Sequence, residues 1–338
     1  MKRAVLLVST GIILAGIAAG ALFVSDLERP YKAYEGTEQF VDIPPGSSQA
    51  AMSRRLTDAG VVRSPATFRG AVWMRGAGRR LQAGEYRFDR PMSAAEVVDK
   101  IRRGDVFLQT ITFREGLTIR QMSELYESRG LGRASDFVAA ARNGALIQAI
   151  DPRARDLEGY LFPDTYSLPR TTTAAQLVER MVAAFQKVLT LDLREQAAAR
   201  GLSVRELVTL ASLVEKETAR SEERALVSAV YHNRLRIKMA LYCDPTVIYA
   251  LERVGRFSGD LTREDLQFDS PYNTYRYAGL PPGPIAAPGR ASLEAAANPA
   301  DASYLYFVSR NDGSHVFANT LDEHNRNVYE YQKKPYRN

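Results

Sequence analysis

The chain has 338 residues, of which 45% are hydrophobic and 25% are charged, and its formal net charge is +6. This length allows two or three domains of ordinary globular composition. The positive charge is modest and spread along the chain without a basic block that contains aromatic residues, which argues against a nucleic-acid-binding protein. The single cysteine, Cys243, excludes an internal disulfide and a cysteine-rich zinc site. The three histidines show no ligand spacing, so we expect no metal and no cofactor.

The N-terminus predicts a membrane anchor. Residues 1–3 contain Lys2 and Arg3 and precede an uncharged run over residues 4–24. At about 1.5 Å per residue, a helix of this length crosses a hydrocarbon core of about 30 Å. The basic pair should stay in the cytoplasm, so the rest of the chain should lie on the outer side of the membrane. Small residues at Ala18, Ala19 and Ala21 leave a cleaved secretory signal as the alternative.

The first folded region should be a small α+β module. Residues 25–38 are polar and predict a stalk. After it we expect a strand over 40–43, a helix from Ser47 or Ser48 toward Gly60, a helix over Pro65–Met74 and a strand over Gly84–Phe88. A helix over Ala94–Arg103 and a strand over 106–113 should follow. The order strand, helix, helix, strand resembles LysM-type glycan-binding modules, and the alternative is a packing domain that binds nothing.

A weak internal sequence similarity, an echo of this module, links it to the segment that follows it. Four residues recur at an offset of 70 positions: Gly46, Met52, Ser53 and Gly60 return as Gly116, Met122, Ser123 and Gly130. Each copy reads as a glycine turn, a helix and a glycine stop. The identities indicate either a structural repeat or only the shared punctuation of two helices, and two copies are too few for a solenoid.

The second half of the chain alternates helices with two unusual loops. A helix pair is expected over 134–150, and further helices over 173–190, 204–218, 222–238, 244–251 and 321–331. Residues 157–166 form an aromatic-rich loop broken by a proline, and residues 270–289 form a long loop rich in tyrosine, proline and glycine. A loop of that length inside a compact domain is usually functional. The Asp312-Gly313 pair between two apolar runs predicts a hairpin.

The helix expected over 204–218 places two carboxylates in an apolar pattern. At about 100° per residue, Glu217 falls between Leu210 and Leu213 inside the apolar arc, and Glu215 falls at its margin. A carboxyl group among apolar neighbours loses solvation, which raises its pKa and allows it to act as a general acid near neutral pH.

A structural role explains the same pattern. Acids on half-buried helices are commonly paired with a cation, and Arg220 or Arg224 could be that partner. Periodicity also does not choose between Glu215 and Glu217.

A resemblance to a known family addresses that choice. The segments LEGYLFPDTY, ASLVEKET, NRL, DPTVIYAL, YNTYRYAGLPPGPIAAPG and YLYFVSR, the last followed by the pattern H.F..T...HN from His315, resemble those of the endolytic murein transglycosylases, the YceG-like family. The likeness covers the anchor and roughly residues 157–328, and it is densest over 210–289.

The resemblance implies an α+β protein in several parts. These are a cytoplasmic tip over 1–3, a transmembrane helix over 4–24, a stalk over 25–38, a LysM-like βααβ module with a connecting hairpin over 39–115, a helical connector over 116–156 and a mixed α/β catalytic domain over 157–332 that bears the glutamate helix. It also implies a single-pass protein of the cell inner membrane, with its N-terminus in the cytoplasm and its catalytic domain in the periplasm. Its implied partners are the glycan strands of peptidoglycan and the penicillin-binding proteins of the wall synthesis machinery.

The implied activity is endolytic cleavage of the N-acetylmuramic acid–N-acetylglucosamine bond that leaves 1,6-anhydro ends. In the family's EKET motif the second glutamate is catalytic, which here is Glu217. The protonated acid would donate to the leaving oxygen. The resulting Glu217 carboxylate would then take the proton of the sugar's own C6 hydroxyl as that hydroxyl closes on C1, so no second carboxylate is obligatory.

The remaining expected site residues form the substrate cleft. They are Glu158, Tyr160, Asp164, Glu215, Asp244, Thr246, Asn273, Thr274 and Tyr275. Glu215 is expected to orient or support the helix. One alternative is a hydrolase in which Asp164 or Asp244 activates water, and another is a non-catalytic wall-binding scaffold.

Overall fold

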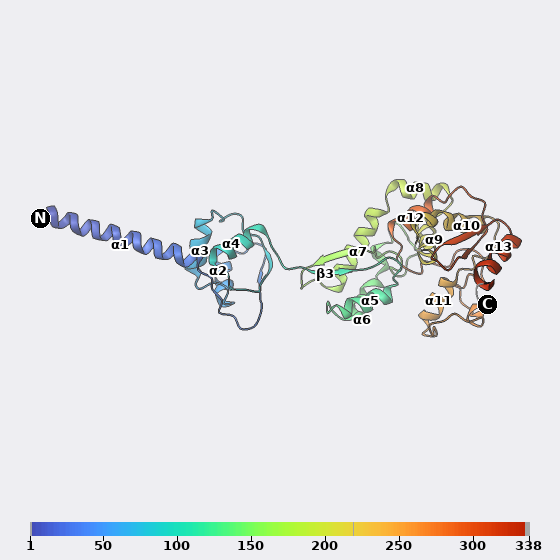
Figure 1. Ribbon diagram of the computed structural model, residues 1–338, viewed down its shortest axis with the longest axis horizontal. Helices are drawn as coiled ribbons and strands as arrows, with labels where there is room; N and C mark the ends of the chain where they lie inside the picture. The colour runs from blue at the N-terminus through green and yellow to red at the C-terminus, as the bar shows by residue number, and fades with distance from the viewer. Residues whose placement is uncertain (1, 219, 335–338) are drawn as a thin grey trace. The chain divides into compact units, whose positions relative to one another are not determined.

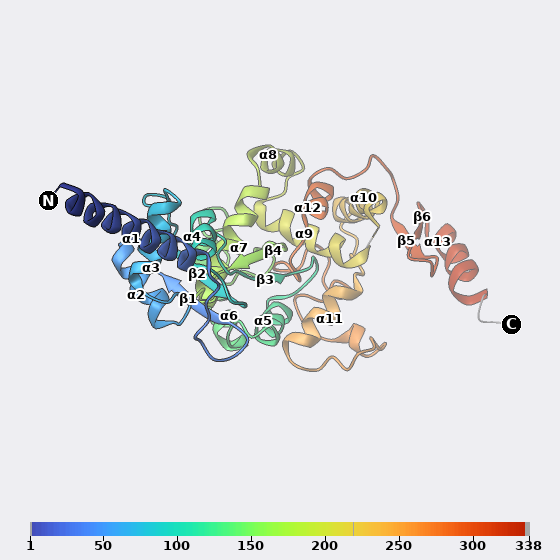
Figure 2. The same ribbon diagram turned by 60° about the vertical axis from the view of Figure 1, so that its left-hand side comes forward.

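The computed structural model describes the backbone of residues 2–218 and 220–334, and in the first helix only the side chains of residues 10, 14, 16–18 and those from 20 onward. The chain forms two compact units (Figures 1 and 2). One consists of Met1–Gln109 with Ser167–Thr171, and the other of Thr110–Tyr166 with Thr172–Asn338. Each unit has its own core.

The first unit contains a helix, a two-stranded sheet and three short helices. Its elements are α1 (Lys2–Glu28), β1 (Gln39–Ile43), α2 (Gln49–Asp58), α3 (Pro65–Met74), β2 (Gly84–Phe88) and α4 (Ala94–Arg103). The strands pair antiparallel with Val41 opposite Tyr86. The order strand, helix, helix, strand expected between residues 40 and 88 is therefore observed.

Short polar residues fix the helix starts in this unit. Ser48 accepts a hydrogen bond from the backbone of α2, Ser64 does the same ahead of Pro65 in α3, and Ser93 forms a capping box with Glu96 in α4. The apolar faces then meet in one core, whose fully buried members include Ile43, Leu56, Phe68, Tyr86, Val97 and Ile101.

The expected membrane segment is only partly described. More than half of the side chains over residues 4–24 lie outside the described residues. In the portion of the chain that the structure does describe, no helix combines the length and the apolar character needed to cross a membrane.

The second unit is mainly helical and contains two small sheets. Its helices are α5 (Ile119–Ser128), α6 (Ala134–Ala141), α7 (Ala174–Val188), α8 (Leu191–Ala199), α9 (Val204–Glu217), α10 (Arg224–Arg236), α11 (Asp244–Arg253), α12 (Arg290–Ala297) and α13 (Leu321–Val328). Single turns are η1 (Gly144–Leu146), η2 (Ser221–Glu223), η3 (Asp265–Gln267) and η4 (Tyr329–Lys333). The strands β3 (Gln109–Thr112) and β4 (Thr165–Leu168) form one pair, and β5 (Tyr306–Ser309) and β6 (His315–Ala318) form the other.

Several elements differ from the expectation. The expected helix pair over 134–150 is α6 followed by a single 3₁₀ turn, and the strand expected over 106–113 is shorter. Helices α8 and α12 and strand β4 were not predicted. The first two are short and rich in alanine, so they carry little periodic apolar signal, and the third lies beside a proline-broken loop.

Helix α9 forms the centre of the second unit. It contacts α8, α10, α11 and α12, and Figure 1 shows it between α10 and α12. All residues from Leu207 to Val214 are buried, including the polar Thr209 and Ser212. The helix is thus enclosed on all sides, more completely than the one-sided apolar arc predicted.

The 70-residue echo corresponds to matching local structure. Helices α2 and α5 each have ten residues, and each bears a buried methionine, Met52 or Met122, followed by a buried serine. The glycines before and after both helices, at positions 46, 60, 116 and 130, all have positive φ. Each helix follows a strand and precedes a second helix. The two segments therefore share a βααβ layout, as a structural repeat would.

The β5–β6 hairpin and α13 close the chain. Val308 pairs with Val316, and the turn between the strands contains the expected Asp312-Gly313. Helix α13 packs on both strands, as Figure 2 shows. This arrangement brings the hairpin to the cavity described next.

Candidate active site

The carboxyl group of Glu217 lies at the C-terminal end of α9, on the wall of a cavity of about 660 Å³. The cavity is lined by Glu217, Arg234, Met239, Tyr242, Asp244, Tyr275, Tyr306, Phe307, Val308, Ser309, His315, Leu321, His324, Val328 and Gln332. It therefore joins α9 to α10, α11, the 270–289 loop, the hairpin and α13. Of the expected site residues, it brings together Glu217, Asp244 and Tyr275.

The surroundings of Glu217 favour its protonated form. Burial raises the pKa of Glu217, and the nearby Asp244 carboxylate raises it further. The C-terminal end of a helix is also the negative end of its dipole. Hydrogen bonds from Cys243 and Tyr231 and the charge of His315 oppose this shift, but the pKa remains raised. The Tyr231 hydroxyl donates its bond to Oε1 of Glu217 at 2.9 Å.

Glu215 faces a second cavity of about 610 Å³. Its Oε2 accepts a hydrogen bond of 2.9 Å from the backbone N–H of Gly289, and its Oε1 lies 3.8 Å from the Arg224 guanidinium. This cavity is lined by Phe113, Arg114, Glu115, Glu215, Lys216, Glu217, Thr218 and Arg224. Glu217 borders both cavities, so open space lies on two sides of this residue at the end of α9.

Buried side chains hold the 270–289 loop against the start of α11. The hydroxyls of Thr246 and Thr274 lie 2.9 Å apart, and Thr274 Oγ1 also accepts from the backbone of Cys243. The Asn273 amide donates to the carbonyls of Leu266 and Phe268. The Thr246, Asn273 and Thr274 side chains are at most 1% exposed. They position the cavity wall and do not line it.

Tyr275 and Asp244 lie on the cavity wall that these buried hydrogen bonds hold in place. The Tyr275 hydroxyl donates a short hydrogen bond to Oδ1 of Asp244. Burial and this bond raise the pKa of Tyr275, so its hydroxyl stays protonated. The Tyr275 ring also meets Tyr242 edge-on at 5.3 Å. Together these groups offer an aromatic face and a carboxylate beside Glu217.

Three expected residues lie away from this cavity. Glu158 is buried, where its carboxyl accepts hydrogen bonds from Ile119 N–H and from the Tyr249 hydroxyl. The Tyr160 hydroxyl donates to Asp151. Asp164 is exposed and bonds the adjacent backbone N–H. None of the three lines either of the cavities that Glu217 borders.

The LEGYLFPDTY motif has a packing function instead. Gly159 has φ of +80°, and a Cβ built there would lie 2.4 Å from Pro284. Only a glycine accepts both that backbone conformation and that contact. The motif therefore fits directly against the proline-rich loop.

The structure adds residues that sequence reasoning missed. Tyr231, Arg234, His315 and His324 border or contact the Glu217 site, and Glu223 binds His315. The guanidinium of Arg234 is buried and donates to the carbonyls of Leu305 and Leu241. The sequence signal for these residues was that Arg234 lies in the NRL motif and that His315, after the hairpin turn, belongs to the pattern on which the family resemblance rests.

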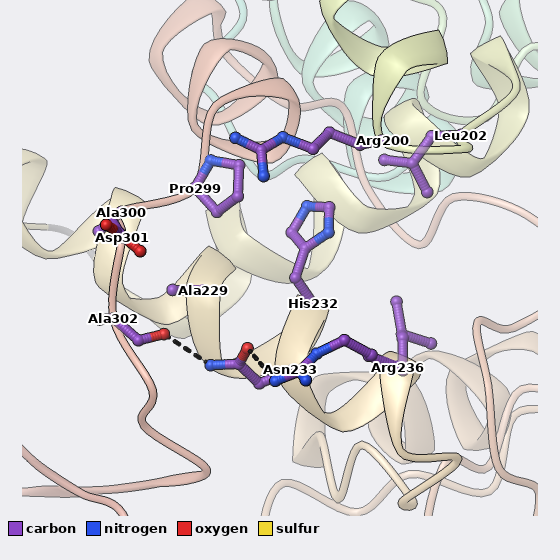
Figure 3. Close-up of a pocket in the computed structure, with 11 residues that line it drawn as sticks. Arg200, Leu202, Ala229, His232, Asn233, Arg236, Pro299, Ala300, Asp301 and Ala302 are labelled. Carbon is purple, nitrogen blue, oxygen red and sulfur yellow. Dashed lines mark hydrogen bonds between the residues drawn. The ribbon is translucent and has the colours of Figure 1, made fainter.

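A further cavity, of about 670 Å³, contains His232 and Asn233 of α10 (Figure 3). Nε2 of His232 bonds the carbonyl of Ala296, and the Asn233 amide donates to the carbonyl of Ala302. Burial lowers the pKa of His232. These side chains hold α10 against the backbone around residues 296–302. None of the expected site residues lines this cavity. The Glu217 cavity is therefore the better candidate for chemistry.

The chain belongs to the YceG-like family, which it matches over residues 41–330. Among named relatives, it is 31% identical over 330 residues to the endolytic murein transglycosylase of Bacillus subtilis, covering 93% of this chain and 91% of that protein. It is 32% identical over 355 residues to the endolytic murein transglycosylase of Streptococcus pneumoniae, covering 96% of this chain and 64% of that protein.

A solved structure supports the fold. A YceG-like protein of Listeria monocytogenes, 31% identical in sequence, superposes with a TM-score of 0.59 over 86% of this chain and 98% of the other. Within residues 2–218 and 220–334, no group of three or more histidine, cysteine or acidic side chains is placed so that it could hold a metal ion.

Proposed function

We propose that this protein is a lytic transglycosylase that cuts the glycan strands of peptidoglycan internally, with Glu217 as its general acid. The observation that carries the proposal is a carboxyl group with a raised pKa on the wall of an aromatic-lined cavity. Relatives that match most of this chain carry the name endolytic murein transglycosylase.

The chemistry requires one proton donor. Glu217 gives its proton to the glycosidic oxygen that leaves C1 of N-acetylmuramic acid, and the bond from C1 to that oxygen breaks. The C6 hydroxyl of the same sugar closes on C1 and loses its proton to a base in the cavity. The product end is a 1,6-anhydro sugar, and no water is consumed.

Internal cleavage requires room for glycan on both sides of the broken bond. Glu217 borders two cavities, of about 660 and about 610 Å³, which supports this mode of action. Tyrosine faces at 242, 275 and 306 line the first and suit the stacking of sugar rings. Arg114, Lys216 and Arg224 add cationic groups in the second.

A hydrolase is the competing reaction. Asp244 lies in the same cavity as Glu217 and could activate a water molecule, whereas Asp164 lines neither cavity that Glu217 borders. The products separate the two reactions, because an anhydro end weighs one water less than a reducing end.

The decisive experiment is digestion of purified sacculi followed by mass spectrometry of the released fragments. Wild type should release fragments with anhydro ends, and Glu217→Gln should lower the rate at least about a hundredfold with the fold retained. Glu215→Gln is the matched control on the same helix, and it should retain turnover and lose mainly stability or substrate affinity. Release of reducing ends alone by wild type would support the hydrolase, and no release at all would support the wall-binding scaffold.

We further propose that the uncharged run over residues 4–24 anchors the protein in the cell inner membrane and leaves the chain from residue 25 onward in the periplasm. In α1 the described side chains of Leu14, Ile17, Leu22, Phe23 and Val24 are exposed, as lipid-facing residues would be. Deletion of residues 1–24 should release the protein from washed membranes.

The βααβ layout of the first unit supports a LysM-like glycan-binding role for residues 39–115. A proposed role beside the penicillin-binding proteins of the wall synthesis machinery, where cleavage would terminate nascent strands, rests on the family resemblance. Sedimentation of the full chain with sacculi, with and without substitutions on the exposed face of α2, tests the first of these roles.

A further inference from the structure

A carboxylate–histidine pair stands beside Glu217. Nδ1 of His315 lies 2.7 Å from Oε2 of Glu223, and the His315 backbone N–H donates to Oε1 of the same carboxylate at 2.8 Å. The Glu223 side chain is nearly fully buried. A bond from Thr218 Oγ1 to Oε2 of Glu223, at 3.3 Å, joins the pair to the residue that follows Glu217. The imidazole is therefore fixed in position relative to the end of α9.

This arrangement determines which ring nitrogen is available. Although burial pulls the pKa of Glu223 upward, its hydrogen bonds with His315 hold that pKa below the ordinary value, so the carboxyl is an anion and accepts only. Nδ1 must then carry the hydrogen, and in the neutral ring Nε2 bears a free lone pair. Across the described residues, no hydrogen-bond partner of Nε2 is found.

The available nitrogen belongs to the catalytic cavity. His315 lines the same cavity as Glu217, and in its protonated form its charge lowers the pKa of the Glu217 carboxyl. The His315 and Phe307 rings pack at right angles, with centroids 5.4 Å apart at an angle of 89°. Because Nδ1 is engaged by Glu223, Nε2 is the ring nitrogen left to meet a ligand in this cavity.

We propose that His315 is a second catalytic residue, the base that removes the proton from the C6 hydroxyl, and that Glu223 is its positioning residue. This inference rests on the proposed transglycosylase function. Glu217 gives its proton to the leaving glycosidic oxygen as the bond from C1 to that oxygen breaks. The C6 oxygen forms its bond to C1, and its proton passes to Nε2 of His315.

The two groups share one proton throughout this cycle. Before reaction the proton is on Glu217 and His315 is neutral, and afterwards Glu217 is an anion and His315 is an imidazolium. Return of the proton across the cavity restores the first state without any external acid or base. The rate should fall on the acid side as Glu217 and His315 together bind a second proton, and on the alkaline side as they lose the one proton that they share.

Other charged groups around the cavity do not supply an equivalent base. Besides Glu217 and His315, the charged and titratable residues that line the cavity are Arg234, Tyr242, Asp244, Tyr275, Tyr306 and His324. Asp244 accepts from Tyr275, and His324 stacks on Tyr306 at 5.2 Å without a carboxylate partner among the described residues. Arg220 approaches the same hairpin, where it donates to the carbonyl of Asp312. His324 also has a ring nitrogen, Nδ1, without a hydrogen-bond partner in the described part of the chain, but its ring is not held by a carboxylate as that of His315 is.

The test is a pH–rate profile of sacculus digestion by the full chain, with anhydro ends quantified by mass spectrometry. His315→Gln should lower the rate about a hundredfold, keep the anhydro product and remove the fall in rate on the acid side. Glu223→Gln should lower the rate about tenfold and move the acid-side fall to lower pH, because a neutral amide no longer stabilises the imidazolium. His232→Gln, in the cavity of Figure 3, is the control and should match wild type in both rate and profile.

Chemical rescue guards against a purely structural effect. Imidazole added to His315→Ala should restore at least about tenfold of the lost rate, which a structural histidine would not allow. An unchanged acid-side profile in both His315→Gln and Glu223→Gln, or no rescue of a folded His315→Ala, would overturn the role of His315. If wild type itself formed no anhydro ends, the proposed function would be wrong instead.

Discussion

The Tyr231 hydroxyl donates a hydrogen bond of 2.9 Å to Oε1 of Glu217. Tyr231 is completely buried in α10, and burial raises its own pKa well above the ordinary range, so its hydroxyl keeps the proton that it donates to Glu217. The bond stabilises the charged form of Glu217 and limits how far burial raises the pKa of that acid. Burial and the Tyr231 hydrogen bond thus act on the pKa of Glu217 in opposite directions.

Tyr231→Phe should therefore raise the pKa of Glu217. A hydrogen bond to a charged acceptor is worth about 1.5–3 kcal/mol, and a pKa difference of one corresponds to about 1.4 kcal/mol. The fall in rate on the alkaline side should move up by about one pH unit, with the plateau rate kept. A pH–rate profile of sacculus digestion measures this, and a movement to lower pH would contradict the assignment of Glu217 as the acid.

Asp244→Asn should have the opposite effect on the same limb. The Asp244 carboxylate raises the pKa of Glu217, so removing its charge should lower that pKa and move the alkaline-side fall in rate to lower pH. Tyr275→Phe is the control, because it removes the hydrogen bond to Asp244 and keeps the charge. Complete loss of turnover in Asp244→Asn would instead indicate that Asp244 activates water.

The sequence predicted the elements with strong local signals. Helices α3 and α4 and strand β2 have the expected bounds, because serine caps and glycine stops mark them. The apolar arc placed Glu217 among buried neighbours, although α9 is enclosed on every side and periodicity could not separate Glu217 from Glu215.

The partners of Glu217 could not be read from local patterns. Tyr231, Asp244 and His315 come from three different elements, and only tertiary packing brings them to one cavity. The hydroxyls of Thr246 and Thr274 bond each other and not a ligand, which depends on the path of a loop without regular structure. The motif resemblance identified Asp244, Thr246 and Thr274 as site positions, but it did not show where their side chains point.

Thr246→Val should destabilise the site scaffold. The Thr246 hydroxyl donates to the carbonyl of Cys243 at 2.7 Å and lies 2.9 Å from Thr274 Oγ1, so its removal leaves buried polar atoms without a partner. We expect a loss of about 1–3 kcal/mol in the free energy of unfolding.

Thr209→Val provides the matched control for that substitution. Thr209 is equally buried, but its hydroxyl has no hydrogen-bond partner among the described residues. The same change of side chain should therefore be neutral or stabilising. Urea unfolding of the full-length variants measures both, and equal losses would contradict the bracing role of Thr246.

Glu158→Gln should change how stability depends on pH. Burial raises the pKa of Glu158 from 4.5 to about 8 in the folded protein. Because the unfolded chain ionises first, the stability contributed by the neutral carboxyl is complete below pH 4.5 and is lost as the pH rises to about 8. A pKa difference of one corresponds to about 1.4 kcal/mol, so wild type should lose about 2–4 kcal/mol between pH 5 and pH 8 relative to the variant.

The glutamine variant isolates this effect because its side chain keeps the local bonds without ionising. The amide that replaces the carboxyl in Glu158→Gln can still accept from Ile119 N–H and bond Tyr249. Urea unfolding of both proteins at pH 5 and pH 8 measures the difference, since all other titrating groups, Glu217 included, contribute equally to both. Parallel stability curves for the two proteins would mean that Glu158 stays ionised in the folded chain.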